Sequence, residues 1–251
     1  MAKELQGYVA LITGGPRNIG RAMALAFAEA GASVVVTAVN DMASAHDAVK
    51  AIEEKGVAGL AVQCDVTQES DVAALRDRVN ERFGRLDILV NNAAVWHEQV
   101  FGEMTYAQWR HVIGVTLDGA FLTATAMLPM LKASGRGAII NMGGMSAYTG
   151  AKKRVHVLAA KSGLGGLTRG LAHDLAEFGI TANLVSPGLI ATVRGGNSAK
   201  EPDHHKHHAT LLGRRGRPEE VADMVVWLGG PYGRYMTGQT IHVNGGAYLP
   251  T

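Results

Sequence analysis

Short segments rich in apolar and β-branched residues recur along the whole chain. They lie at residues 8–12, 33–39, 60–64, 86–90, 137–142, 181–185 and 240–243. Polar or glycine-rich turns bound most of these segments, and such runs are typical of buried strands. Because several are almost wholly apolar, with no alternating polar face, the pattern favours a parallel sheet that is covered on both sides.

Segments with helical spacing of apolar residues separate these strands. They lie at residues 20–31, 43–55, 69–83, 106–134, 161–179 and 218–228. Gly31 is a plausible stop signal for the first helix, and Pro218 with two following acids is a good start for the last. Strand and helix alternate as in βαβ units, so we predict a single Rossmann-like α/β domain over residues 1–251. Its doubly wound parallel sheet has helices on both faces, and the polar, histidine-rich segment 192–217 interrupts the rhythm.

Composition narrows the class of protein. Apolar residues make up 47% of the chain and charged residues 18%, which suits a folded domain with a substantial core. The net charge of +2 is too small to indicate a nucleic-acid partner. Cys64 is the one cysteine, so an intramolecular disulfide and a multi-cysteine zinc site are excluded. No apolar run approaches the length of about 18 residues that a membrane span needs. We expect a cytoplasmic protein with no membrane partner.

A glycine-rich turn joins the first strand to the first helix. Its members Thr13, Gly14, Ile19 and Gly20 fit a Thr-Gly-x-x-x-Gly-x-Gly pattern, with Asn18 in place of the middle glycine. Such a turn lets backbone amides approach a pyrophosphate at the N-terminus of a helix. Asn tolerates left-handed backbone better than most residues, so the substitution is mild. The turn predicts a dinucleotide site.

The end of the second strand bears on which dinucleotide binds. An acid at this place binds the ribose 2′-hydroxyl of NAD and repels the 2′-phosphate of NADP. Residues 37–39 are Thr-Ala-Val, and the next acid is Asp41. Arg17, in the glycine-rich turn, could pair with a 2′-phosphate, although it could also be a solvated loop charge. We predict NADP, with NAD as the alternative.

Together with the Asn-Asn-Ala-Ala segment at 91–94, these features resemble the short-chain dehydrogenase/reductase family over nearly the whole chain. The resemblance implies an NAD(P)(H)-dependent oxidoreductase that acts on a small carbonyl or alcohol, and a homodimer or homotetramer. It also implies an adenine contact at Asp65 and Val66, and a sheet and nicotinamide contact at Asn91 and Ala93. A carboxamide contact is implied at Pro187, Gly188, Ile190 and Thr192.

In this family a Tyr transfers the proton, a Lys four residues later lowers the pKa of the Tyr and holds the ribose, and an upstream Ser orients the carbonyl. Tyr148 and Lys152 have this spacing, but Lys152 lies 35 residues before Pro187. Lys161 lies 26 residues before Pro187, as the family pattern requires, and heads an apolar helix. We therefore assign the family lysine to Lys161 and interpret the other pair as a chance match in an expected loop.

With Lys161 fixed, the Tyr position is Val157, the Ser position is Gly144, and an Asn of the family falls on Thr116. Valine has no proton to give, so the sequence predicts an atypical active site. His156 and His97 are candidates to replace the acid. His156 would lie about 140° round a helix from Lys161, so a packed or exposed histidine is the competing interpretation.

The loop hydroxyls of Ser146 and Tyr148 are further candidates for the missing groups. His204 and His208 could share one helical face, but no third ligand is apparent, and we predict no metal site. A flexible polar lid and the binding of an anionic substrate are the other interpretations of this segment. The leading hypothesis is an NADP-preferring oxidoreductase with a non-standard proton donor. A non-redox lyase and a catalytically inactive nucleotide-binding subunit are the alternatives.

Overall fold

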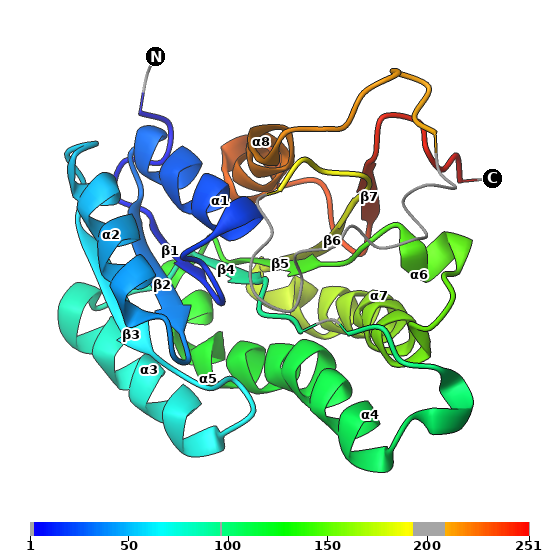
Figure 1. The fold of residues 1–251 in the computed structure, drawn as a ribbon. Coiled ribbons are helices and arrows are strands. Elements are labelled where there is room, and N and C mark those ends of the chain that lie inside the picture. Colours follow the sequence, from blue (N-terminus) through cyan, green and yellow to red (C-terminus); the bar gives the residue numbers. More distant parts are fainter. Residues whose placement is uncertain (1–2, 96, 193–208, 251) are drawn as a thin grey trace.

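A seven-stranded, fully parallel sheet runs through the middle of the protein (Figure 1). This computed structural model describes residues 3–95, 97–192 and 209–250. The strands are β1 (Val9–Ile12), β2 (Ser33–Ala38), β3 (Gly59–Gln63), β4 (Ile88–Asn91), β5 (Ala138–Met142), β6 (Thr181–Pro187) and β7 (Thr240–Val243). Their order in the sheet is β3-β2-β1-β4-β5-β6-β7. The direction of winding therefore reverses between β1 and β4, where doubly wound sheets bind their ligands.

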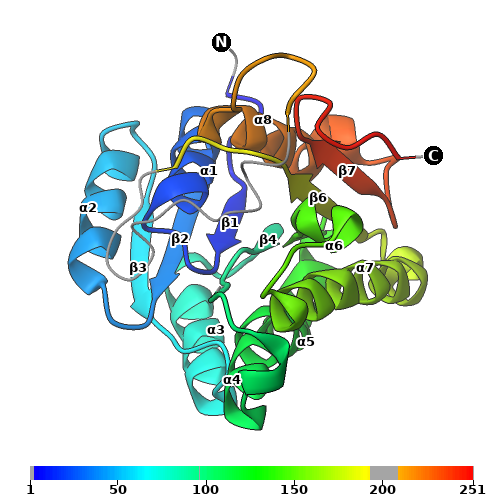
Figure 2. The same cartoon turned by 45° about the vertical axis from the view of Figure 1, so that its right-hand side comes forward.

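Helices cover both faces of this sheet (Figure 2). One face carries α1 (Asn18–Glu29), α2 (Met42–Glu53) and α8 (Pro218–Gly229). The other carries α3 (Glu69–Phe83), α5 (Gly119–Ser134) and α7 (Val155–Leu175). Two shorter helices, α4 (Tyr106–Ile113) and α6 (Ser146–Thr149), lie beside α7. The predicted Rossmann-like fold is confirmed.

Alternate residues of each central strand supply the two cores. In β1, Ala10 and Ile12 belong to the core under α1 and α8, whereas Val9 and Leu11 belong to the core under α3 and α5. All four residues are buried. Because both faces of the strand are covered, a polar residue would be costly on either one, which explains the continuous apolar runs of the sequence.

Three predicted boundaries need correction. The helical stretch 106–134 is interrupted by a π-turn at Gly114–Asp118, between α4 and α5. Helix α7 begins at Val155, so Lys161 lies in its second turn instead of at its head. Tyr148 lies in the short helix α6, where the sequence predicted a loop. The histidines of segment 192–217 lie outside the described residues, so the interpretations placed on His204 and His208 stay predictions.

The stretch Tyr106–Ser134 is long and apolar enough to cross a membrane, with a mean hydropathy of 1.5 in its most apolar window. Length and composition alone do not separate a spanning helix from a core helix, and 44% of that window is buried inside the protein. Here α5 packs against α3 and against β4 and β5, and Met127 and Leu131 are fully buried. The packing accounts for the apolar character of this stretch.

Candidate active site

The glycine-rich turn after β1 has the backbone geometry that a phosphate-binding turn needs. Gly14 has a φ of +64°, and Asn18 has a φ of 50°, which is the left-handed conformation expected from the sequence. A Cβ atom on Gly20 would lie 2.7 Å from the carbonyl oxygen of Gly14. The turn and the first turn of α1 are therefore in direct backbone contact, and a larger residue at Gly20 would force them apart.

The N-terminus of α1 is open to an anion. Arg17 is its N-cap residue but makes no side-chain capping bond, and no acidic residue lies in the first turn of the helix. The helix dipole therefore favours a negative group there. Arg17 Nε lies 3.3 Å from Asp41 Oδ2, and Asp41 caps α2 by accepting from the Ser44 amide at 3.2 Å. This pair holds the exposed guanidinium near the end of β2.

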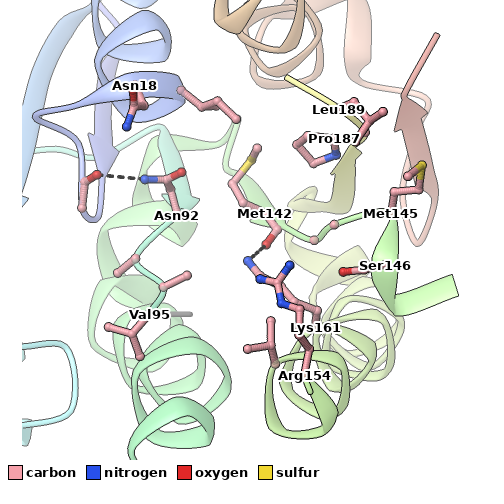
Figure 3. A pocket seen from close by; sticks show the side chains of 18 residues that line it. Asn18, Asn92, Val95, Met142, Met145, Ser146, Arg154, Lys161, Pro187 and Leu189 are labelled. Carbon is pink, nitrogen blue, oxygen red and sulfur yellow. Dashed lines mark hydrogen bonds between the residues drawn. The ribbon is translucent and has the colours of Figure 1, made fainter. Parts of the chain in front are cut away.

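Thr13 fixes the loop that follows β4. Its Oγ1 accepts hydrogen bonds from the amides of Asn92 and Ala93, both at 3.0 Å. Asn92 Nδ2 in turn donates to the carbonyl oxygen of Thr13 at 3.0 Å and to that of Gly14 at 2.9 Å, and Figure 3 shows the second of these bonds. Thr13 thus holds the loop after β4 against the glycine-rich turn. Asn92 was missed by the sequence analysis, although it is the second residue of the Asn-Asn-Ala-Ala segment.

Asn91 is the centre of a buried hydrogen-bond network. It donates to Asn141 Oδ1 at 2.9 Å and accepts from Thr123 Oγ1 at 2.6 Å. Asn141 then donates to Thr168 Oγ1 at 2.9 Å. The network joins the carboxyl ends of β4 and β5 to α5 and α7. Asn91 therefore ties the sheet to these two helices and does not itself line the cavity described next, and its expected place beside the nicotinamide stays a prediction.

A cavity of about 400 Å³ opens where β1, β4, β5 and β6 end (Figure 3). The glycine-rich turn borders one side of it, and the start of α7 borders the other. Its lining includes the predicted cofactor residues Gly14, Asn18, Ile19, Ala93, Lys161, Pro187 and Gly188. A Cβ on Gly188 would lie 2.6 Å from that of Asn244, so this edge also requires glycine. The structure brings these separate motifs to one place.

The other predicted cofactor residues do not line this cavity; besides Thr13, Arg17 and Gly20 of the glycine-rich turn, these are Asp65, Val66, Ile190 and Thr192. Asp65 accepts from the amide and hydroxyl of Thr67 at 2.9 and 2.8 Å, and Val66 is buried beside α5. Ile190 is buried, and Thr192 is the last described residue before the gap. Their proposed contacts with the adenine and the carboxamide stay predictions.

Lys161 points into the cavity and is anchored to the sheet. Its Nζ donates a hydrogen bond to the carbonyl oxygen of Met142 at the end of β5 (Figure 3). Burial, and then the positive charge of Arg154, lower the pKa of Lys161 to about 8. A lysine with such a pKa holds its proton at neutral pH and releases it far more readily than an exposed lysine.

Val157 and Gly144 are the residues at the positions that the sequence analysis assigned to the Tyr and Ser of the family. Both line the cavity, so its wall carries the isopropyl group of Val157 and, at Gly144, no side chain. Thr116 is buried in the π-turn and is not among the lining residues. Ser146, named as a candidate hydroxyl, does line the cavity, on the same side as Lys161 (Figure 3).

Arg154 is a second cavity-lining residue that sequence reasoning missed. It is the N-cap of α7, only 8% of it is exposed, and it lines the cavity beside Val157 and Lys161. Its position three residues before Val157 was a usable signal, because residues i and i+3 share one side of a helix. This spacing was not used, because the helix was expected to begin at Lys161, which left Arg154 outside it.

His156 and His97 do not enter this cavity, contrary to their predicted catalytic role. They line a second cavity of about 390 Å³, together with His111 and Gln108 of α4. Helix α7 is already regular at His156, so its ring is turned away from Lys161, as the helical geometry requires. His156 is fully buried, and neither ring nitrogen makes a hydrogen bond of good geometry to the described residues. Its place fits the packed interpretation.

We expect His156 to make stability depend on pH. Burial lowers its pKa, against a smaller opposing effect of the Arg154 backbone, so the unfolded chain binds a proton there more readily than the folded protein. Stability should then fall as pH drops below about 6.5, by at most about 1.4 kcal/mol per pH unit from this residue. His156→Leu should flatten this part of the urea-unfolding profile between pH 7 and 5, whereas His46→Leu, at an exposed site on α2, should not. A difference from wild type that is constant across this range would contradict the prediction.

Tyr148 belongs to an aromatic cluster away from the cavity. Its ring centroid lies 4.7 Å from that of His242 and 5.6 Å from that of Tyr248. Its hydroxyl lies 3.5 Å from Thr240 Oγ1, and the ring is 39% exposed. Lys152 is exposed as well. Of the two Tyr-x-x-x-Lys interpretations, only the one through Lys161 places a lysine in the cavity.

A phosphate-binding turn at the winding reversal of a parallel sheet, with a lysine facing it from the opposite side, is typical of nicotinamide-dependent oxidoreductases. Comparison with known proteins agrees. Residues 14–248 match the family described as Enoyl-(Acyl carrier protein) reductase. The chain belongs to the short-chain dehydrogenase/reductase family.

Curated relatives extend over almost the whole chain. A 3-oxoacyl-[acyl-carrier-protein] reductase FabG from Staphylococcus aureus is 36% identical over 240 residues, which cover 96% of this chain and 98% of the relative. The corresponding FabG from Vibrio harveyi is 35% identical over 251 residues, with 98% and 99% coverage.

Solved structures agree in fold. A dehydrogenase/reductase from Sinorhizobium meliloti 1021 superposes with a TM-score of 0.90 at 33% identity, covering 99% of this chain and 98% of the other. A blue fluorescent protein from a metagenomic library, in complex with NADPH, gives a TM-score of 0.89 at 34% identity, with 98% and 100% coverage.

Proposed function

We propose that this protein is an NADP(H)-dependent oxidoreductase that reduces a small carbonyl compound, or oxidises the alcohol, with Lys161 as the proton donor. The observation that carries the proposal is the position of Lys161: it lines the cavity with a pKa lowered to about 8, while Val157 cannot supply a proton. An acid with a pKa near the working pH is the effective choice for proton transfer. This assignment replaces the predicted roles of His156 and His97.

The glycine-rich turn fits the proposed cofactor. The carbonyl oxygen of Gly14 lies close to Gly20 at the start of α1, and the first turn of α1 has no acid to repel a pyrophosphate. The metagenomic neighbour in complex with NADPH supports the choice of NADP, as does the guanidinium of Arg17, which pairs with Asp41 just after β2. When bound, NADPH would supply the hydride to the carbonyl carbon of the substrate.

The residues of this chain would then perform the remaining tasks. Lys161, held by the carbonyl of Met142, donates its proton to the oxygen of the substrate as negative charge develops there. Ser146 supplies a hydroxyl that can hydrogen-bond the same oxygen. The apolar side chains of Val95, Val157 and Leu189 line the space for the substrate carbon atoms. Water restores the proton to Lys161 after the product leaves.

The proposal is tested by mixing the protein with NADPH and a panel of small ketones, aldehydes and oxo acids. Loss of NADPH absorbance should match the amount of alcohol formed, measured by chromatography in the same samples. Conversion of a compound without net NADPH oxidation would instead favour the lyase alternative. Tight NADPH binding without conversion of any compound would favour the inactive subunit. Either result would overturn the proposed reduction.

Arg17 should determine the preference between the two cofactors. The Arg17→Gln variant removes the guanidinium near the end of β2, so we expect NADPH affinity to fall by about tenfold and NADH affinity to stay within about twofold. Fluorescence titration of both cofactors measures this. Asp41→Asn is the matched variant, because it removes the ion-pair partner and should leave NADPH binding intact or strengthen it. Equal losses for NADPH and NADH in Arg17→Gln would contradict a role at the 2′-phosphate.

The expected oligomer and location extend the proposal. We propose a cytoplasmic homodimer or homotetramer, and the exposed Phe121 on α5, with 55% of its surface accessible, supports a contact between copies on that helix. Light scattering during size-exclusion chromatography measures the mass. A monomer at micromolar concentration would contradict this part.

A further inference from the structure

A second cavity lies between the starts of α4 and α7, apart from the proposed active site. Its volume is about 390 Å³, which is the size of a pocket for a small molecule. Three histidines, two glutamines and an alanine make up its described lining: His97 and Gln99 from the loop after β4, Ala107, Gln108 and His111 from α4, and His156 from α7. None of these residues lines the cavity that contains Lys161, so the reaction proposed above leaves this second cavity without a use.

His156 is the buried member of this lining. Its side chain is fully buried, and neither Nδ1 nor Nε2 has a hydrogen-bond partner of good geometry among the described residues. A buried polar group without a partner costs free energy, and such groups are few in native proteins. A ligand oxygen that accepts a hydrogen bond from this imidazole would remove that cost. His156 therefore indicates a polar ligand in the cavity.

Two helices begin at this cavity. Ala107 and Gln108 lie in the first turn of α4, and His156 is the second residue of α7. Neither helix has an acidic residue in its first turn. The positive ends of both helix dipoles therefore lie at the cavity, where they favour a negative charge.

The side chains of the cavity favour the same kind of ligand. Its described lining has no aspartate or glutamate, and its imidazoles can each donate a hydrogen bond and take up a proton near neutral pH. Among the residues that the structure describes, no three metal-ligating side chains lie close enough together to hold a metal ion. The methyl group of Ala107 and the flat imidazole rings offer apolar contacts, which an inorganic anion would leave unused. An organic anion therefore fits this cavity better than a metal ion or an inorganic anion.

We propose that this cavity binds a small organic carboxylate with a flat apolar body, such as an aromatic acid. The carboxylate lies near the starts of α4 and α7 and accepts hydrogen bonds from the imidazoles of His111 and His156. The exposed side chain of His97 turns aside to admit the ligand, while the Gln99 amide holds the loop to the carbonyl oxygen of Lys153 at 2.8 Å. This site goes beyond the proposed function, because no step of the reduction uses these residues.

Calorimetric titration of the NADP⁺-saturated protein with benzoate tests the site. Benzamide has the same shape without the charge, and inorganic phosphate has the charge without the ring. We expect benzoate to bind at least about tenfold more tightly than either. His111→Gln removes one imidazole at an exposed position and should weaken benzoate binding by about three- to tenfold. His46→Gln, at an exposed position on α2, is the matched control and should bind benzoate as the wild type does.

Nuclear magnetic resonance of the histidine rings gives a second measurement that needs no variant of the binding residues. Benzoate should shift the ring signals of His97, His111 and His156. The signals of His46 and His173, which are exposed on other parts of the surface, should not move. Shifts confined to histidines outside the cavity would contradict the inference.

Other results would overturn the inference as well. Equal affinity for benzoate and benzamide, or no binding of either, would exclude a site for an organic anion, and equal affinity for phosphate would exclude a contribution from the apolar body. Benzoate binding that is lost in Lys161→Met but kept in His111→Gln would place the ligand in the other cavity. None of these measurements requires turnover, so a failure to reduce any carbonyl compound would overturn the proposed function and leave this site in place.

Discussion

Replacing Lys161 by methionine should lower kcat for carbonyl reduction by about 10²- to 10⁴-fold, the usual contribution of a general acid. Lys161→Arg should lose a similar factor while keeping more of the cofactor affinity, because an arginine keeps the positive charge but does not release a proton at working pH. Pre-steady-state kinetics with saturating NADPH separate the two effects. Lys152→Met, an exposed lysine of the alternative Tyr-x-x-x-Lys match, is the control and should be unchanged.

The same assignment fixes the pH dependence of the wild type. The acid must carry its proton in the direction of reduction, and the pKa of Lys161 is lowered to about 8, chiefly by burial. The rate of reduction should therefore be constant below pH 7 and fall tenfold per pH unit well above about 8. A rate that stays level to pH 10 would rule out Lys161 as the donor and direct attention to Ser146 with water.

The double variant Gly144→Ser and Val157→Tyr should raise the reduction of neutral ketones by about 10²-fold, because it adds an acid and a hydroxyl at the family positions. A Cβ on Gly144 meets nothing within 4 Å, so the serine fits without strain. Val157 lines the cavity one helical turn before Lys161, so a tyrosine hydroxyl there faces open space and the lysine that would lower its pKa.

Two variants control this experiment. Gly144→Ser with Val157→Phe supplies the ring without the hydroxyl and should show no gain. Gly143→Ser should destabilise the protein, because a Cβ there would lie 2.5 Å from Leu184 Cδ2. If the tyrosine and phenylalanine variants have equal activity, the cavity is shaped differently from that of the family around Val157, and Arg154 is the first side chain to remove.

The sheet could be predicted because burial on both faces leaves a direct mark on the sequence. The strand β1 is apolar throughout and β2 contains three consecutive valines, and Thr240–Val243 was predicted to the residue. The residue at which a helix starts leaves a weaker signal in the sequence. The N-cap of α7 is Arg154, which is no capping residue, and its first turn has no acid, so nothing in the local sequence announced that the helix begins before Lys161.

The same error affected the prediction of the catalytic groups. His156 was already expected about 140° round a helix from Lys161, and the helix that begins at Val155 is regular enough to keep it there, while Arg154 at its start lines the cavity. Cofactor motifs did not depend on this boundary, because backbone turns with glycine are fixed by local sterics. Side chains that share a helix depend on its phase, and a shift in where the helix is taken to begin changes which of them are expected to meet.

The buried network of Asn91, Asn141, Thr123 and Thr168 bears on how such a site can change over time. It locks the ends of β4 and β5 to two helices without using any side chain that faces the cavity, and Lys161 is tethered to a main-chain oxygen. The frame and the reacting groups are therefore separate sets of residues. A lineage can exchange the proton donor by single substitutions while the support underneath stays intact, so new chemistry on this scaffold need not begin with a loss of folding.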